Sequence, residues 1–227
     1  MKSGGVRLAG PHDGVATITL DIPETKNALS IAVRDDVTEC LEHLADNEHV
    51  KTVVVTGAGS TFCSGFDLRE FGHIDEDPDL AERVWASGDR FHRACLAFPL
   101  PMVAAVNGPA IAGGFDLAVM CDLRVAVRSA RFEHPEREFS EVVYGPLEDL
   151  VGASVARDLA LTGRPVTAEE AFDLHLVNRL VDDEAGLDVA VHEITNQITH
   201  APREILVRMM KKIVARAGVV RDRTLDL

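Results

Sequence analysis

The pattern of apolar and polar positions predicts alternating strands and helices over the first part of the chain. Residues 15–21 alternate and are rich in β-branched side chains, which is typical of a half-buried strand. Ser30 can cap a helix from residue 31 to about 45, where apolar side chains recur at near-helical spacing. Residues 51–59 and 102–108 are short apolar runs that end in glycine turns, as expected of buried parallel strands.

A further helix is predicted over residues 81–97, and residues 111–136 combine a helix-like apolar run with an alternating, strand-like run. This order favours an α/β sheet with ligand chemistry at the strand ends. After Glu148 the pattern changes to helices separated by short breaks. We therefore predict a first part over residues 1–150 and a helical region over residues 151–227, which packs on the sheet or on a neighbouring subunit.

Composition narrows the class of protein. The chain has 227 residues, of which 46% are hydrophobic, enough for a sizeable core. A net charge of −14 argues against nucleic acid as a partner. No apolar run approaches the ~18 residues of a membrane span, and the N-terminus lacks the apolar core of a signal peptide. The four cysteines form no CxxC pair and no close His/Cys cluster, so we expect a reduced, cytoplasmic protein without a metal site.

Candidate chemistry lies in the segment "IAGGFDLAVMCDLRVAVRSARFEHPE", residues 111–136. Two glycines precede Asp116, and Glu136 follows twenty residues later. An acid in the first turn of a helix is favoured by the helix dipole alone, so neither acid is a strong signal by itself. As a pair beside glycines, they could hold one water, one taking its proton and the other assisting protonation of a neighbouring carbon. For His134 a structural or surface role is the simpler interpretation.

Several motifs in order carry a resemblance to a known family. They are "TKNALS", "VVVTGAGSTFCSGFDLREF", "PMVAAVNGPAIAGGFDLAVMCDLRVAV" followed by "RFEHPE", and "LALTGRPVTAEEAFDLHLVNRLV". Over nearly its whole length the chain resembles the crotonase, or enoyl-CoA hydratase/isomerase, family. The resemblance implies an α/β fold with a repeated β-β-α core and a helical C-terminal region. It also implies an acyl-CoA thioester as substrate, no separate cofactor, a homotrimer or hexamer, and a place in fatty acid metabolism.

The resemblance also implies site residues. The N–H groups of Phe66 and Gly113 match the family's oxyanion hole, and Asp116 and Glu136 match the two catalytic carboxylates. Two preset N–H donors would stabilise the negative charge that the thioester oxygen gains when water adds to the adjacent double bond. Contacts to coenzyme A or substrate are implied for Lys26, Ala28, Ser64, Asp67, Leu68, Arg69 and Gly114.

The chain departs from the family pattern at three places. Hydratases usually carry Glu at the position of Asp116. Dienoyl-CoA isomerases carry Asp there, but their further Asp, eight residues past the second acid, is Tyr144 in this chain. The segment after Glu136 and the helical C-terminal region are both shorter than usual.

We therefore predict a hydratase that adds water to a trans-2-enoyl-CoA. The alternatives are an enoyl- or dienoyl-CoA isomerase that relies on Glu136, another reaction of the family such as C–C hydrolysis or decarboxylation, and a CoA-thioester-binding protein without turnover.

Overall fold

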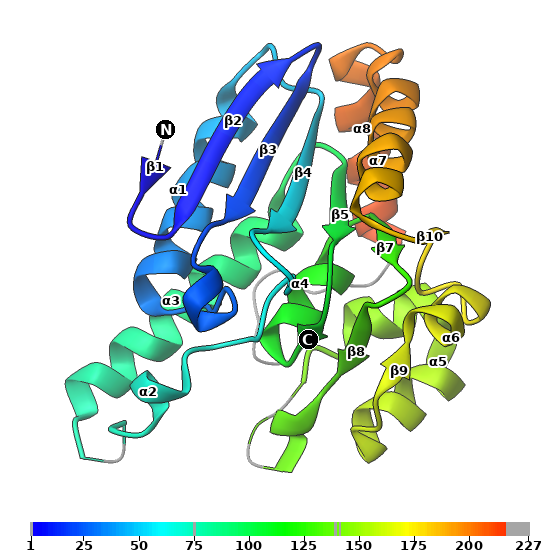
Figure 1. Cartoon of the computed structure of the whole chain (residues 1–227). Coiled ribbons are helices and arrows are strands. Elements are labelled where there is room, and N and C mark those ends of the chain that lie inside the picture. Colours follow the sequence, from blue (N-terminus) through cyan, green and yellow to red (C-terminus); the bar gives the residue numbers. More distant parts are fainter. Residues whose placement is uncertain (1, 75, 139, 141, 217–227) are drawn as a thin grey trace.

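The computed structural model describes residues 2–74, 76–138, 140 and 142–216. A seven-stranded sheet in the order β1-β2-β3-β4-β5-β7-β10 forms its centre, and a small sheet in the order β6-β8-β9 lies beside it (Figure 1). The strands are β1 (Lys2–Ser3), β2 (Val6–His12), β3 (Val15–Leu20), β4 (Thr52–Gly57), β5 (Met102–Val106), β6 (Ala110–Ile111), β7 (Leu123–Val127), β8 (Arg131–Glu133), β9 (Val166–Thr167) and β10 (Arg179–Val181).

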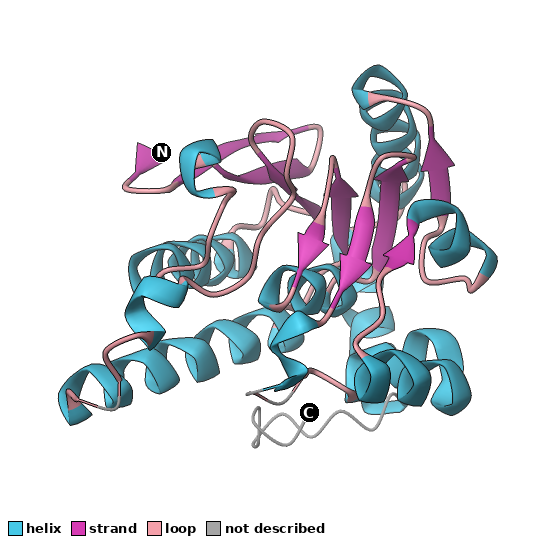
Figure 2. Cartoon of the chain, turned by 60° about the horizontal axis from the view of Figure 1, so that its bottom comes forward, coloured by secondary structure: helices cyan, strands magenta, loops and turns pink. Residues whose placement is uncertain are grey.

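Helices cover the sheet and extend beyond its lower edge (Figure 2). They are α1 (Ile31–Asp46), α2 (Leu68–Phe71), α3 (Pro78–Ala97), α4 (Gly113–Met120), α5 (Gly145–Thr162), α6 (Ala168–Asp173), α7 (Glu184–Thr199) and α8 (Arg203–Arg216), with 3-10 turns η1 (Pro23–Thr25) and η2 (Pro135–Glu138). Helices α1 and α3 pack against each other behind β2 and β3, and α7 packs against β5 and β7 (Figure 1).

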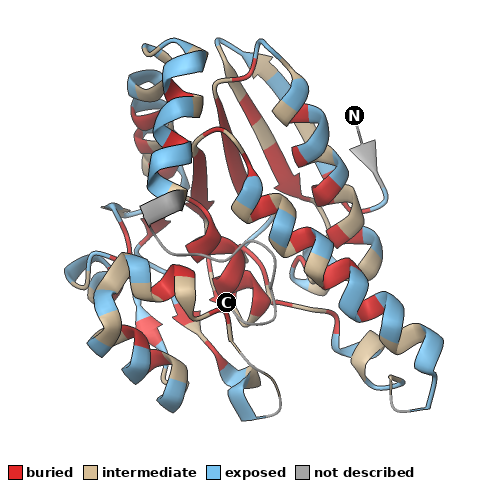
Figure 3. Cartoon of the chain, turned by 180° about the vertical axis from the view of Figure 1, so that it is seen from behind, coloured by how far each residue is buried: buried red, intermediate tan, exposed pale blue. Residues whose placement is uncertain are grey.

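The central strands are parallel and buried, as the apolar runs predicted. Strands β3, β4, β5, β7 and β10 pair in parallel, and all five residues of β5 are buried. Figure 3 shows the same burial on the inner strands and on the inward faces of the helices. Successive parallel strands end at one edge of the sheet, so the loops that follow β4 and β5 lie together there.

Most predicted elements are confirmed. The strands predicted over 15–21, 51–59 and 102–108 are β3, β4 and β5, and the helix after Ser30 is α1. The Ser30 hydroxyl accepts a hydrogen bond from the Val33 N–H at 3.4 Å, which is the predicted N-cap.

The sequence pattern missed several strands, among them the short β1 and β6. Strand β2 forms the hairpin with β3, and β9 and β10 lie inside the region expected to be helical. Helix α5 runs across residue 150, and buried residues from both sides of that position, such as Phe115 and Leu159, belong to one core.

Candidate active site

Two loops far apart in the sequence meet at the ends of β4 and β5. The Ile111 N–H donates to the Cys63 carbonyl at 2.9 Å, which joins the segment before Phe66 to the segment before α4. Gly65 has φ +87°, and a Cβ there would lie 2.7 Å from the Ala112 Cβ and 3.0 Å from the Gly113 nitrogen. A side chain at Gly65 would therefore push the two loops apart.

Where these loops meet, the backbone N–H groups of Phe66 and Gly113 have no hydrogen-bond acceptor among the described residues. The Leu29 N–H donates to the Gly65 carbonyl at 2.8 Å, and the Leu29 carbonyl accepts a hydrogen bond from the Asp67 N–H at 3.4 Å. Because Gly65 and Asp67 flank Phe66, the Phe66 N–H faces away from Leu29. Gly113 opens α4, whose first N–H groups have no partner inside the helix. Neither N–H donates to an acceptor within the part of the chain that the structure describes.

The two amides are also close to each other. A Cβ added to Gly113 would lie 3.6 Å from the Phe66 nitrogen and 2.8 Å from Cδ1 of the Phe66 ring. Only glycine leaves the space between these amides open. Ala112, just before Gly113, has φ 53° and ψ −129°, a strained conformation held by a 2.8 Å bond from its N–H to Glu133 O. Two unpaired donors beside a helix N-terminus form a site that stabilises a developing negative charge.

Asp116 lies one turn into α4 and is 6% exposed. Its Oδ1 accepts a hydrogen bond from the Val143 N–H at 3.3 Å. Burial raises the pKa of this carboxyl to about 7, against the opposing effect of His134. A carboxyl with a pKa near neutrality is suited to accept and return a proton.

Glu136 lies in η2, opposite Asp116, and is joined to it by a histidine. Nδ1 of His134 and Oε1 of Glu136 are 2.7 Å apart, and Nε2 of His134 is 3.9 Å from Oδ1 of Asp116. The ring of His134 stacks on Phe115, with centroids 4.5 Å apart. Burial by itself would lower the pKa of His134, but the Glu136 hydrogen bond and the charges of Asp116 and Glu136 outweigh it and raise that pKa.

Asp116, His134 and Glu136 are also close enough together to bind one metal ion. One ligand-type atom from each of Asp116, His134 and Glu136 lies within 4.8 Å of the others. The shortest contact in the group is a direct nitrogen–oxygen hydrogen bond of 2.7 Å between His134 and Glu136. We therefore interpret the group as an acid–base set, and the expectation of no metal stays a prediction.

The residues implied to contact coenzyme A fall into two groups. Lys26, Ala28 and Ser64 lie on adjacent loops, and the Ser64 N–H donates to the Lys26 carbonyl at 3.1 Å. The exposed Lys26 side chain is available to a ligand. Arg69, by contrast, forms an ion pair with Asp67 at 2.6 Å.

The other two implied residues differ in burial. Leu68 is 69% exposed at the start of α2, whereas Gly114 is buried in the first turn of α4.

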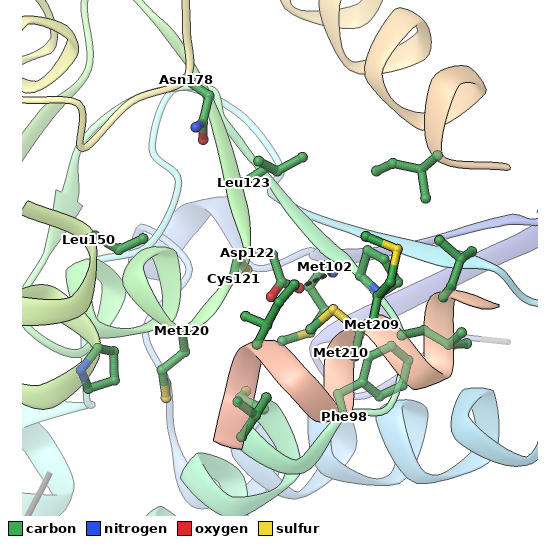
Figure 4. Close-up of a pocket in the computed structure, with 18 of the residues that line it drawn as sticks. Phe98, Met102, Met120, Cys121, Asp122, Leu123, Leu150, Asn178, Met209 and Met210 are labelled. Atoms are coloured by element: carbon green, nitrogen blue, oxygen red, sulfur yellow. Dashed lines mark hydrogen bonds between the residues drawn. The ribbon is translucent and has the colours of Figure 1, made fainter. Parts of the chain in front are cut away.

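A cavity of about 760 Å³ lies elsewhere, at the amino-terminal ends of β5 and β7. Met102 and Leu123 border it from the strands, and Met209 and Met210 of α8 point into it (Figure 4). None of the candidate site residues lines this cavity. The chemistry predicted from the sequence therefore belongs to the opposite ends of the strands.

Sequence reasoning missed two residues that the structure places at the site. His134, for which the sequence favoured a structural or surface role, is 1% exposed and lies between Asp116 and Glu136. Arg34 is fully buried, and its guanidinium carbon lies 4.3 Å from the centroid of the Phe66 ring. The signal for Arg34 was a charge on the apolar face of its helix, between Val33 and Val37.

Comparison with known proteins gives consistent results. The profile of the enoyl-CoA hydratase/isomerase family matches residues 10–226. A probable peroxisomal enoyl-CoA hydratase 1 of Arabidopsis thaliana is 32% identical over 92% of this chain and 78% of its own. A putative enoyl-CoA hydratase of Thermus thermophilus is 36% identical over 88% of this chain and 80% of its own.

Solved structures agree with the sequence relatives. An enoyl-CoA hydratase/carnithine racemase from Magnetospirillum magneticum superposes with a TM-score of 0.86 at 28% identity, covering 95% of this chain and 81% of that one. An enoyl-CoA hydratase of Mycobacterium smegmatis gives a TM-score of 0.85 at 30% identity, covering 99% of this chain and 88% of that one.

Among the described residues, every helix is too short or too polar to cross a lipid bilayer.

Proposed function

Because the chain belongs to the enoyl-CoA hydratase/isomerase family, we propose that it is an enoyl-CoA hydratase acting on a trans-2-enoyl-CoA thioester. The observation that carries this proposal is the arrangement around α4. The N–H groups of Phe66 and Gly113, which have no acceptor in the described part of the chain, lie together at the start of the helix that carries Asp116. Asp116 in turn lies within 4.8 Å of a ligand-type atom of Glu136, as expected for two acids that act on one water.

The proposed reaction uses each group once. The thioester oxygen accepts hydrogen bonds from Phe66 and Gly113, which draws electrons from the double bond and favours attack on the carbon farther from the thioester. Asp116 accepts a proton from water as the water oxygen bonds to that carbon. Glu136 gives a proton to the carbon next to the thioester, and the product is a 3-hydroxyacyl-CoA. Coenzyme A enters as part of the substrate, so the reaction needs no separate cofactor.

The alternative is a double-bond isomerase in which Glu136 moves the proton. The shorter side chain of Asp116 favours it, because a misplacement of about 1 Å can lower a rate on the order of 100-fold. Tyr144, at the position of the isomerases' further Asp, opposes it. Hydration remains our leading proposal, because Asp116 is buried next to His134 and Glu136 rather than displaced from them.

The test is incubation with enoyl-CoA esters of several chain lengths, followed by mass spectrometry. Hydration adds the mass of one water and removes the conjugated double bond, whereas isomerisation moves the bond at constant mass. Asp116→Asn, purified in the same way, controls for hydratase from the expression host. Binding of the esters without any product would instead support a CoA-thioester-binding protein and refute the proposal.

We also infer assembly into a homotrimer or hexamer. Leu161 of α5, Val189 of α7 and Met209 of α8 are 75%, 61% and 53% exposed, and large exposed apolar side chains are typical of subunit interfaces. Light scattering after size-exclusion chromatography measures the mass directly. A monomer at micromolar concentration would contradict this inference without affecting the proposed reaction.

A further inference from the structure

We propose that His134 is the positioning residue of this site: as an imidazolium, it fixes Glu136 through Nδ1–H and stabilises the Asp116 carboxylate through Nε2–H. The roles of the two acids in this inference rest on the proposed function. The positions of the three side chains do not depend on it. The two acids and the histidine would then form one charge-compensated set rather than a pair of independent carboxylates.

The first observation is the direction of the two ring nitrogens. Nδ1 is 2.7 Å from Oε1 of Glu136, a distance within the range of charge-assisted hydrogen bonds. Nε2 is 3.9 Å from Oδ1 of Asp116 and has no hydrogen-bond partner in the described residues. A buried ring nitrogen without a partner is costly unless something completes its bonding. A small closure of the site, or one water, would join Nε2 to Asp116.

The second observation is that the ring cannot turn away. His134 is 1% exposed, and its ring lies nearly parallel to Phe115, with an interplanar angle of 24°. Phe115 is itself held against Phe132, with centroids 5.3 Å apart. Phe115 precedes Asp116 on α4, so the same helix that carries the acid also fixes the histidine that faces it.

The third observation is the balance of charge. Among the described residues, the titratable groups that face the ring are Asp116 from α4 and Glu136 from η2. Cys63 interacts with Asp116 from the neighbouring loop, but burial raises the pKa of its thiol to about 12, so it stays neutral. Two acids in a buried site repel each other when both are ionised. A cation between them permits Asp116 to be ionised as a base while Glu136 keeps a fixed orientation.

Glu136 also has an atom left for chemistry. Oε1 is engaged by His134, whereas Oε2 is buried and has no hydrogen-bond partner among the described residues. Oε2 is therefore the oxygen that would deliver the proton to the substrate carbon. In this arrangement His134 touches no reacting atom and acts only through the two acids.

The charge of the ring can be measured without any turnover. Long-range proton–nitrogen NMR correlation distinguishes an imidazolium, with both nitrogens protonated, from a neutral ring. His134→Gln identifies the His134 signals by their loss. We expect an imidazolium at about pH 7.5, and loss of that charge in Asp116→Asn, which removes the carboxylate opposite Nε2.

His92 provides an internal control in the same spectrum. Burial, followed by the charge of Arg34, lowers the pKa of His92 to about 4, and neither of its ring nitrogens has a partner in the described residues. His92 should therefore be neutral where His134 is charged. A neutral His134 at about pH 7.5 would overturn the proposal even if the protein proved to be a hydratase.

A second experiment measures the pH dependence of kcat/KM in two variants of His134. One variant can keep the contact to Glu136, and the other can keep the contact to Asp116. His134→Asn places an amide near Nδ1 and can still reach Glu136, whereas His134→Gln reaches toward Asp116. Both lose the cation, so the acidic limb of kcat/KM should move up by about 1 to 3 pH units. A loss of rate with no movement of the limb would show a merely structural role and would also overturn the proposal. Absence of enoyl-CoA turnover in the wild type would refute the proposed function instead, while the NMR result still decides the charge of the ring.

Discussion

The guanidinium carbon of Arg34 lies 4.3 Å from the centroid of the Phe66 ring, so a buried cation contacts the residue that we propose as one oxyanion donor. Nη1 of Arg34 also donates to the Leu29 carbonyl at 2.6 Å, and that carbonyl accepts the Asp67 N–H as well. Arg34 therefore fixes both the side chain of Phe66 and the backbone next to it.

Replacing this cation should destabilise the fold and loosen the oxyanion hole. Arg34→Met keeps much of the length but leaves Glu70, 3.6 Å away, without its cation. We expect a loss of about 2 to 4 kcal/mol in the free energy of unfolding, measured by urea denaturation, and a lower kcat. Arg90→Met is the matched control, because Arg90 is 53% exposed in its pair with Asp35 and should cost less than about 1 kcal/mol. Equal losses in both variants would contradict this role for Arg34.

The two carboxylates can be tested by isosteric replacement. Asp116→Asn and Glu136→Gln should each lower kcat by about 100- to 10,000-fold, because each removes one general acid or base. Circular dichroism should show an unchanged fold. Asp116→Glu should keep or raise hydration if side-chain length is the only obstacle. Full activity in Asp116→Asn would leave Glu136 acting alone and favour the isomerase.

Asp116→Asn should also make stability less dependent on pH. Burial raises the pKa of Asp116 to about 7 in the folded state, so the unfolded chain ionises first. The wild type therefore loses stability as pH rises from near the ordinary value of 3.8 to about 7. The variant cannot ionise, so it should gain roughly 2 kcal/mol relative to the wild type between about pH 5 and pH 8, less any part offset by His134. Thermal unfolding at both pH values measures this, and a constant difference would contradict it.

The oxyanion hole can be separated from the side chain of Phe66. Phe66→Ala keeps the N–H and should retain substantial turnover. Phe66→Pro removes the N–H and should lower kcat on the order of 100- to 1,000-fold. Binding of a CoA ester must be measured in parallel, since proline could distort the loop. A proline variant that folds, binds and turns over normally would exclude Phe66 from the hole.

Ligands should stabilise the protein selectively. Acetyl-CoA at about 100 times its Kd should add roughly 2.7 kcal/mol to the free energy of unfolding and raise Tm, whereas ATP, NAD and metal ions should not. Lys26→Ala should weaken CoA binding by about 5-fold, the loss of one charged contact. Arg69→Ala should have a smaller effect, because Arg69 is already paired with Asp67. Stabilisation by ATP but not by acetyl-CoA would refute the assignment.

Elements with local signals could be predicted from the sequence. The apolar run of β4 and the Ser30 cap of α1 depend on neighbouring residues, so pattern alone located them. Strand β10 could not be found this way. It has only three residues, and it forms by pairing with β7 from more than fifty residues earlier in the chain.

The same distinction holds at the site. Asp116 and Glu136 were found because glycines and spacing mark them in one segment. The burial of His134 depends on Phe115 and Phe132, and the contact of Arg34 with Phe66 joins residues of separate elements. Neither contact leaves a local pattern, since each arises only when the elements pack.

The pairing of β10 with β7 has a practical consequence for engineering. Arg179, Leu180 and Val181 align with Val125, Ala126 and Val127 at the border of the seven-stranded sheet. A fragment that ended at the Gly163 cap of α5 would leave β7 as an unpaired, apolar edge, which is prone to aggregation. Supplying the missing segment as a separate peptide would cover that edge, which makes the turn after α5 a rational position for a split-protein reporter.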